Sequence, residues 1–456
     1  METFDLIIVG AGSGNSILTP DFDDWKVAMV ERGPFGGTCL NRGCIPSKMF
    51  VYAADRAQHA KHSEHLGVDT SFRGARWPDI VDRVFGRIDP IAEDGAEWRA
   101  GPDNPNLTVF ATDSKFVGPK QLEVGGGQVI TAPTIVLAAG ARPFVPPIPG
   151  LADVNYKTSA SIMRLDTLPD RLIILGGGFI ASEMAHIFGG LGSDVTIINR
   201  SAKLLRDQDH QVSDAFTQAC KDRFTVHAGS GIAQVHESNG EFTVTLENGT
   251  VVTGDQLLAA TGRTPNGTQL NVEATGVTMD DEGYVITDDH FRTEAEGIWA
   301  IGDIQSHYQL KHTANAETKA AAHNIIAVHE GRDDLQAVDY SGVPSAVFAS
   351  PQIGRMGATE QELQSAETDY ISAVKKYGDT AYGWAMEDTT SFCKILADPQ
   401  TRLILGAHII GPQAATLVQQ LVQAYQFGIT VDQMAKGQMW IHPALTEVIE
   451  NCLLDL

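Results

Sequence analysis

Short runs of apolar residues, each followed by a glycine-rich turn, recur along the first two thirds of the chain. Residues Asp5–Val9 and Leu172–Leu175 are two such runs, and each leads through glycines and a helix-like segment into a second apolar run, Val27–Val30 or Val195–Ile198. A strand, a helix and a parallel strand in this order form a βαβ unit. The duplicated pattern therefore predicts an α/β fold with two Rossmann-like domains.

Two further apolar runs, Thr134–Gly140 and Leu257–Gly262, also end in glycine. The pattern of glycines stops near Gly342. Beyond it, an alternating run at Leu403–Ile410 and a helical segment at 416–426 predict a separate α+β unit at the C-terminal end.

Composition and charge narrow the possible partners. The 456 residues predict about three domains, and 33 basic against 57 acidic residues give a net charge of −24. This balance argues against nucleic acids and anionic membranes as partners. The sequence contains no run of 18 apolar residues, so no membrane span is predicted. The start of the chain, Met1–Asp5, does not resemble a signal peptide. Five cysteines are too few for a disulfide-stapled secreted domain, so we expect a cytoplasmic protein.

The first glycine cluster predicts a dinucleotide-binding turn. Gly10, Gly12 and Gly14 precede Asn15, which stands where the usual fingerprint has glycine or alanine. Glu31 lies about 20 residues after Gly10, at the end of the second strand, where an acid accepts hydrogen bonds from ribose hydroxyls. A structural turn without a ligand is the alternative interpretation.

The second cluster is a complete fingerprint that favours NADPH. Its members are Gly176, Gly178, Phe179, Ile180 and Ala181. At the end of the following strand, Asn199 replaces the acid that would select NADH, and Arg200 and Arg206 follow. A 2′-phosphate needs nearby cations, although both arginines could also be solvated surface charges.

Cys39 and Cys44 are the candidate redox pair. Zinc is a poor explanation because no second pair with ligand spacing is present. Five residues of regular helix rise about 7.5 Å, whereas a disulfide tolerates Cα separations up to about 6.8 Å. We therefore expect a distorted helix start, which Gly43 and Pro46 would permit. The N-terminus of this helix would lower the pKa of a nearby cysteine thiol and favour its thiolate form. No metal site is predicted.

A second candidate lies near the C-terminus, where Pro443 follows His442 and an acid, Glu447, stands five residues after the histidine. A carboxylate in the first turn of a helix could orient the imidazole and support its protonated form. An ordinary surface or core histidine is the alternative. For the other three cysteines, Cys220, Cys393 and Cys452, buried and unreactive thiols are expected.

Together these motifs resemble the class I flavoprotein disulfide reductases, and Gly36–Lys48 is the most specific segment. The resemblance covers the whole chain. It implies an FAD-binding domain at 1–148 that returns at 271–338, an NADPH-binding domain at 149–270 and a dimerisation domain at 339–456. It further implies a homodimer whose two active sites are each built from both subunits.

The resemblance also assigns roles to individual residues. Cys39 matches the thiol that attacks the substrate, and Cys44 matches the thiol beside the flavin. His442 and Glu447 match an acid–base pair supplied by the other subunit. The remaining matches concern cofactor contacts: the ion pair beside the flavin (Lys48 and Glu183), the aromatic gate (Phe179), the ribitol acid (Asp303), and further flavin or nucleotide contacts (Gly37, Thr38, Gly140, Gly262, Lys311 and His312).

The expected activity is NADPH-dependent reduction of a small-molecule disulfide through FAD and a Cys39–Cys44 disulfide. Three enzymatic alternatives remain from the sequence: a dihydrolipoamide dehydrogenase, a glutathione reductase-like enzyme and a metal-ion reductase. The C-terminal cysteine pair expected for mercury transfer is missing, because Cys452 stands alone. A flavoprotein that only senses redox state is a further alternative, against which the complete set of Cys39, Cys44, His442 and Glu447 argues.

Overall fold

The computed structural model describes residues 1–456 as a mixed α/β protein. The chain divides into two compact units, each assembled from separate stretches of sequence. The first unit contains Met1–Pro46, Val81–Phe144 and Gly262–Asp339, and the second contains Ser47–Ile80, Val145–Thr261 and Tyr340–Leu456. The domain boundaries expected at 148, 270 and 338 remain a prediction.

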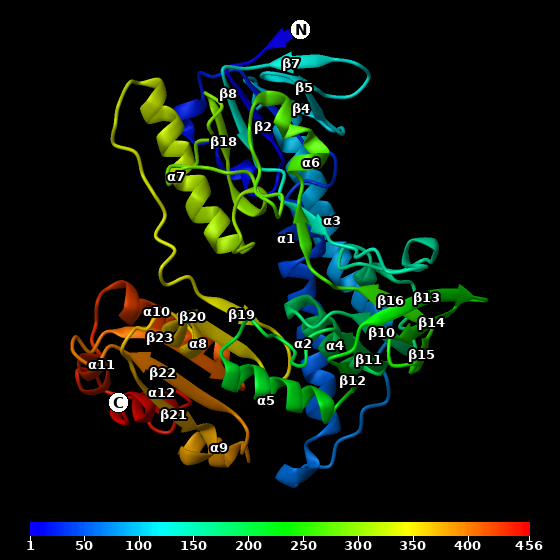
Figure 1. The fold of residues 1–456 in the computed structure, drawn as a ribbon, viewed down its shortest axis with the longest axis vertical. Helices are drawn as coiled ribbons and strands as arrows, with labels where there is room; N and C mark the ends of the chain where they lie inside the picture. The colour runs from blue at the N-terminus through cyan, green and yellow to red at the C-terminus, as the bar shows by residue number, and fades with distance from the viewer. The chain divides into compact units, whose positions relative to one another are not determined.

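A five-stranded parallel sheet forms the centre of the first unit (Figure 1). Its strands, in spatial order, are β18 (Ile298–Ala300), β8 (Thr134–Leu137), β2 (Leu6–Val9), β3 (Val27–Val30) and β4 (Leu107–Phe110). All four residues of β2 and of β3 are buried, as expected for parallel strands covered on both faces.

Alternate residues of these strands belong to two separate cores. Leu6 and Ile8 pack with residues of helix α7 (Lys311–His329), whereas Ile7 and Val9 pack with Phe116 on the opposite face. Phe116 belongs to a small sheet of β1 (Glu2–Thr3), β7 (Val129–Thr131), β6 (Gln121–Glu123) and β5 (Lys115–Gly118). The other elements of this unit are β9 (Ala141–Pro143), paired with β17 (Arg263–Pro265), the short helix α6 (Gly267–Leu270) and most of α3 (Trp77–Ala100).

The helix expected after the first glycine turn is not an α-helix. Two 3₁₀ turns, η1 (Gly14–Ser16) and η2 (Pro20–Phe22), connect β2 to β3 instead. Pro20 lacks an amide hydrogen and disfavours helical conformation at Thr19, so a regular helix cannot continue through this position. The predicted helix was wrong because the glycine turn and the flanking strands are compatible with a short connection, and Pro20 interrupts any helix there.

The expected distortion at the cysteine pair is present. Helix α1 (Gly37–Arg42) has Gly43 as its C-cap, and helix α2 (Cys44–Lys61) begins at the next residue. The backbone of Gly43 has φ −135° and ψ −119°, and a Cβ there would lie 3.0 Å from the carbonyl oxygen of Thr38. Glycine therefore permits the break between the two helices.

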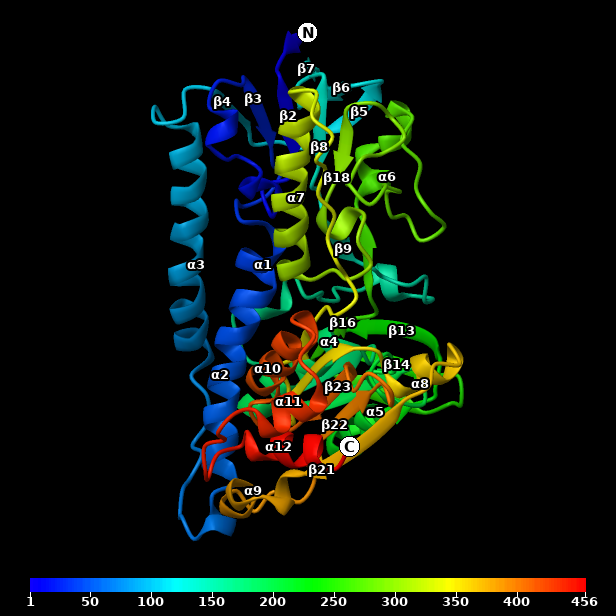
Figure 2. The same cartoon turned by 90° about the vertical axis from the view of Figure 1, so that its left-hand side faces the viewer.

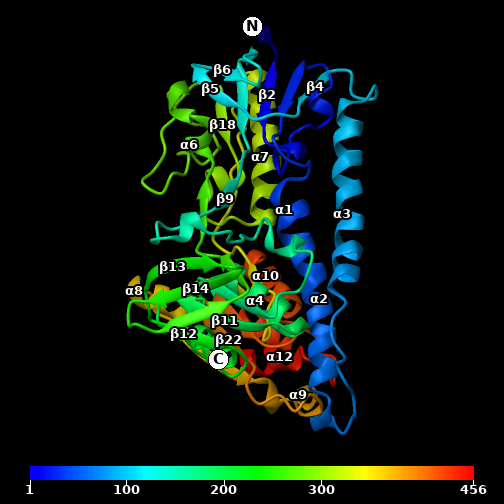
Figure 3. The same cartoon turned by 90° about the vertical axis from the view of Figure 1, so that its right-hand side faces the viewer.

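In the second unit, a four-stranded parallel sheet contains the second glycine fingerprint. Its order is β12 (Thr225–Ala228), β11 (Asp194–Asn199), β10 (Arg171–Leu175) and β16 (Gln256–Ala259). Helix α4 (Phe179–Leu191) packs on β10 and β11, and α5 (His210–Lys221) contacts β12. An antiparallel sheet follows, formed by β13 (Ile232–Ser238), β14 (Glu241–Leu246) and β15 (Val251–Gly254). Figure 3 shows β13 and β14 beside β11 and β12.

The C-terminal part of the second unit is the expected α+β unit. Its sheet has the order β19 (Ser345–Val347), β20 (Ile353–Gly357), β23 (Ile404–Ile410), β22 (Phe392–Ala397) and β21 (Ile371–Lys376), with all pairs antiparallel. Helices α10 (Ala414–Gln426) and α12 (Glu447–Leu454) pack on it (Figure 2). Three short helices complete it: α8 (Glu360–Ser365), α9 (Ala381–Ala385) and α11 (Val431–Lys436).

None of the helices is both long enough and apolar enough to cross a membrane.

Candidate active site

Cys39 and Cys44 lie in contact as two free thiols in the first unit. The pKa of Cys39 is lowered from 9.0 to about 7, chiefly by a hydrogen bond from Cys44. Burial opposes this shift, and the positive charge of Lys311 assists it. Since the thiolate is the reactive form of cysteine, about half of Cys39 is in its reactive form at pH 7.

The charges around Cys39 come from segments far away in the sequence. Lys311, the first residue of α7, donates a hydrogen bond from Nζ to Ser13 Oγ at 3.1 Å, on the first glycine turn. Asp303 raises the pKa of Cys39 slightly, but Arg263 holds that carboxylate at 3.2 Å. The unit therefore brings Cys39, Cys44, Asp303 and Lys311 together, and their contacts with a flavin stay a prediction.

The first glycine turn fits a bound dinucleotide. Gly10 has φ +110°, and a Cβ there would lie 2.3 Å from the carbonyl oxygen of Ala138. A Cβ on Gly37 would lie 2.6 Å from the Cα of Gly12, so the two backbones approach closely. Glu31 directly follows β3. Its carboxylate accepts hydrogen bonds from the amides of Ala11 and Gly33, each at 2.8 Å. These bonds fix an acid beside the turn.

The second fingerprint leads directly into a regular helix. Gly176 has φ +120° and no room for a side chain, whereas a Cβ on Gly178 would meet no atom within 4 Å. Phe179 begins α4 and is 48% exposed, while Ala181 is buried. The amides at this helix start can therefore receive phosphate groups.

The structure reveals a role for Asn199 that the sequence did not suggest. Its Nδ2 donates hydrogen bonds to the carbonyl oxygens of Ser201 and Lys203, both at 2.9 Å. Asn199 thus shapes the loop that follows β11. Arg200 and Arg206 both extend from this loop into solvent.

Lys48 and Glu183 interact electrostatically in the second unit. The pKa of Glu183 is raised to about 7, chiefly by burial, against a hydrogen bond from the Phe348 amide and the attraction of Lys48. Burial likewise lowers the pKa of Lys48. The Lys48 ammonium also lies 3.4 Å from the centre of the Phe348 ring, a cation–π contact. Both ionisable groups are thus shifted toward their neutral forms.

His442 and Glu447 form the expected pair. His442 Nδ1 lies 2.7 Å from Glu447 Oε1, and Glu447 is the first residue of α12. The imidazole is 72% exposed, whereas the carboxylate is 16% exposed. The carboxylate fixes the orientation of the ring and leaves Nε2 directed at solvent, where it can exchange a proton with a bound molecule.

The other candidate residues occupy positions consistent with backbone contacts. Thr38 lies in α1, His312 is the second residue of α7, and Ile180 lies in α4. Gly140 and Gly262 follow strands β8 and β16 with φ values of +64° and +132°. The three remaining cysteines are buried, as expected. No group of three or more histidines, cysteines, aspartates or glutamates could hold a metal ion.

Several contributors had no signal in the sequence. Phe348 lies 165 residues from the Glu183 carboxylate that it binds, and Arg263 lies 40 residues from Asp303. Neither belongs to a motif. These partners meet only through the tertiary packing of segments that are distant in the sequence.

Each of the two units carries one glycine turn of the dinucleotide-binding type. In the first unit the turn lies near the Cys39–Cys44 pair, and the C-terminal part of the second unit carries the His442–Glu447 pair. The family model of the pyridine nucleotide–disulphide oxidoreductases matches residues 4–320, and the model of their dimerisation domain matches residues 343–452. The chain belongs to this family of flavin- and pyridine nucleotide-dependent enzymes and is a flavoprotein disulfide oxidoreductase.

The individual relatives agree with this assignment. The chain is 43% identical to the mycothione reductase of Mycobacterium tuberculosis, covering 100% of both proteins. It is 34% identical to a mercuric reductase of Bacillus cereus over 94% of this chain and 68% of that protein. The solved structure of a Cu(II) complex of the HOCl-induced flavoprotein disulfide reductase RclA from Escherichia coli has a TM-score of 0.87, with 24% identity and 100% coverage of both chains. This last similarity concerns the fold.

Proposed function

We propose that the protein reduces a low-molecular-weight disulfide, mycothione, with NADPH, using FAD and the Cys39–Cys44 pair. The observation that carries the proposal is the contact between these two thiols, in which Cys44 stabilises the thiolate of Cys39. One thiol is thereby prepared for attack, and its neighbour is placed to complete the exchange.

The thiol chemistry follows from this pair. The Cys39 thiolate attacks one sulfur of the substrate, which forms a mixed disulfide and releases the first thiol. Cys44 then attacks Cys39, which releases the second thiol and leaves a Cys39–Cys44 disulfide. His442 protonates the first departing thiolate through Nε2, while Glu447 holds the ring in orientation through Nδ1. Bound FAD supplies the two electrons from NADPH that return this disulfide to the dithiol.

The glycine turns and the charges beside them are the proposed cofactor contacts. Glu31 and the Gly10–Gly14 turn would hold the adenosine and phosphates of FAD, with Lys48 and Glu183 near its ring system. Arg200 and Arg206 would bind the 2′-phosphate of NADPH, which planar guanidinium groups recognise well.

The active enzyme is proposed to be a homodimer in which His442 of the partner subunit completes each site. The dimerisation-domain match at 343–452 includes His442 and Glu447 and supports this arrangement. Regeneration of a thiol by NADPH serves a reducing compartment, so we place the reaction in the cytoplasm.

The choice of mycothione rests on the 43% identity to a mycothione reductase and on the segments Gly10–Ser16 and Cys44–Ala54. Mycothione is the symmetric disulfide of a sugar-based thiol and lacks the carboxylates of glutathione disulfide. A net charge of −24 does not attract an anionic disulfide.

Steady-state kinetics with NADPH test the assignment. We expect kcat/KM for mycothione to exceed that for glutathione disulfide by at least about 100-fold, because the wrong disulfide leaves polar groups of the substrate site unpaired. The value for mycothione should also exceed that for lipoamide. The Cys39→Ser variant is the control and should be inactive with all three. Comparable values, or a preference for glutathione disulfide or lipoamide, would refute mycothione as the substrate.

A further inference from the structure

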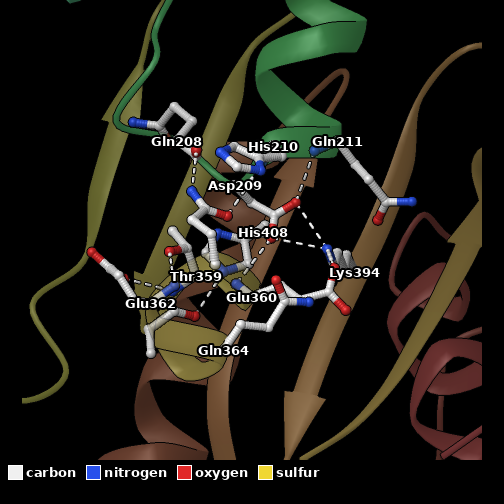
Figure 4. Close-up of polar contacts among 12 residues, drawn as sticks. Gln208, Asp209, His210, Gln211, Thr359, Glu360, Glu362, Gln364, Lys394 and His408 are labelled. Carbon is white, nitrogen blue, oxygen red and sulfur yellow. Dashed lines mark hydrogen bonds and ion pairs between the residues drawn. The ribbon is translucent and has the colours of Figure 1, made fainter. Parts of the chain in front are cut away.

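A buried ionic cluster connects the second dinucleotide sheet to the C-terminal sheet within the second unit. Lys394, on β22, donates hydrogen bonds from Nζ to both carboxylate oxygens of Asp209 at 2.9 Å and to Glu360 at 2.7 Å. The side chains of Lys394 and Asp209 are 1% and 0% exposed. Figure 4 shows these groups converging between α5, α8 and the strands of the C-terminal sheet.

The cluster is costly to bury, and it takes no part in the proposed chemistry. Removing charges from water carries a penalty that only good geometry and additional hydrogen bonds offset. Asp209 meets this condition, since its carboxylate also accepts bonds from the amides of Gln211 and Glu360. Burial alone would raise the pKa of Asp209, but the hydrogen bond from Lys394 and the nearby charges lower it, so the carboxylate stays ionised.

The position of the cluster in the chain is informative. Asp209 is the N-cap of α5 and directly follows the loop 200–208, which carries Arg200 and Arg206. Two further bonds from the C-terminal part hold the same stretch: Arg355 Nη1 donates to the carbonyl oxygen of Asp207 at 2.6 Å, and Gln361 Nε2 donates to that of Gln208 at 2.9 Å.

The glycine fingerprint holds the loop beside Arg206, and Asn199 holds its start. The amide of Leu205 donates to the carbonyl oxygen of Gly177 at 2.7 Å, and Asn199 binds Ser201 and Lys203. The loop is thus held at its start by Asn199, at Leu205 by the nucleotide turn and at residues 207–209 by the C-terminal sheet. The Arg206 side chain is 66% exposed and contacts its neighbour Asp207 at 3.4 Å. Its placement therefore depends on the backbone of the loop.

We infer that Lys394 is a positioning residue for NADPH selection. By holding Asp209, it fixes the loop so that Arg200 and Arg206 can reach one 2′-phosphate together. The C-terminal domain thereby contributes to cofactor specificity without touching the cofactor. This inference rests on the proposed assignment of both arginines to NADPH.

The experiment measures binding of two probes to the FAD-containing enzyme, adenosine 2′,5′-bisphosphate and 5′-AMP, which differ by the 2′-phosphate. In Lys394→Met we expect the Kd for the bisphosphate to rise at least about 10-fold, as for loss of one charge-assisted contact, while that for 5′-AMP changes less than about 2-fold. KM for NADPH should rise, and kcat at saturating NADPH should stay unchanged. Merely lower stability would not discriminate between the two probes.

Two further variants guard against a folding defect. Lys394→Met with Asp209→Asn removes both buried charges and keeps an N-cap. Arg355→Ala with Gln361→Ala leaves the buried ion pair in place and removes the outer bonds to Asp207 and Gln208, together with the bond from the His210 amide to Gln361. Both should show the same selective loss. Lys375→Met on the neighbouring strand β21 breaks the ion pair with Asp455 and should leave both Kd values unchanged.

The outcomes separate the two hypotheses. If the wild type binds both probes equally, the assignment of NADPH fails, and this inference fails with it. If the wild type and Lys375→Met prefer the bisphosphate and Arg200→Ala loses that preference, the NADPH assignment stands. Unchanged preference in the folded Lys394 and Arg355/Gln361 variants would then overturn the inference alone.

Discussion

The contact between the two active thiols predicts a specific pH dependence for Cys39. At pH 7, a thiol with a pKa of about 7 is half ionised, whereas one at the ordinary value of 9.0 is about 1% ionised. The hydrogen bond from Cys44 is the largest cause of the shift. Replacing Cys44 with alanine should therefore move the pKa of Cys39 upward, at most to about 9 and with up to about 50-fold less thiolate at pH 7.

The reaction rate changes less than the thiolate fraction, because a more basic thiolate is a better nucleophile. With a Brønsted coefficient of about 0.45, two pKa units make each thiolate about 8-fold more reactive toward a disulfide. Cys44→Ala should thus react up to about 6-fold more slowly than the wild type at pH 7 and faster at pH 10. The two rate–pH curves should cross between these values.

The assay is the initial reaction of the prereduced enzyme with 2,2′-dipyridyl disulfide from pH 5 to 10, with the modified cysteine identified by mass spectrometry. Cys44→Ser is the matched control, since its hydroxyl still donates a hydrogen bond, and it should keep most of the shift. Background from Cys220 should be small because burial raises its pKa to about 12. Parallel curves for the wild type and Cys44→Ala would refute the hydrogen bond as the cause.

Three further predictions address the cofactor, the assembly and the acid. Arg200→Ala combined with Arg206→Ala should lower kcat/KM for NADPH at least about 10-fold and leave that for NADH unchanged; an equal loss with both nucleotides would count against phosphate recognition. Dissociated and mixed Cys39→Ser and His442→Ala dimers should recover activity as heterodimers, which would not occur if each site belonged to one chain. Glu447→Gln should lower kcat at least about 10-fold while nucleotide binding is retained, and a wild-type kcat would contradict its role beside the imidazole.

Most of the strands and helices that local patterns predicted are present in the structure. Val27–Val30 forms a strand with the expected bounds, and the expected helix start at Phe179 is observed, since buried parallel strands and glycine turns are defined by adjacent residues. The helix break at Gly43 was predicted from the reach of a disulfide. The contact between His442 and Glu447 was predicted from a spacing of five residues that a helix start can close.

Contacts between distant segments could not be predicted in this way. Glu183 owes its raised pKa chiefly to burial. The backbone amide that donates to its carboxylate belongs to Phe348, which directly follows β19 in the same unit. Lys394 appears in the sequence as one lysine of a strand, where an exposed position is the usual expectation. Only the packing of α8 and α5 against the C-terminal sheet makes it a buried partner of two acids.

The two dinucleotide turns also differ in how they can stabilise phosphate. At the second turn, α4 runs for 13 residues, so its N-terminus provides free amides and a favourable dipole. At the first, the 3₁₀ helix η1 has three residues, which is too short to contribute such a dipole. Here the Lys311 side chain lies beside the glycine turn, where its Nζ donates a hydrogen bond to Ser13 Oγ at 3.1 Å. The same ammonium lowers the pKa of Cys39, so one positive charge lies beside both the glycine turn and the reactive thiolate.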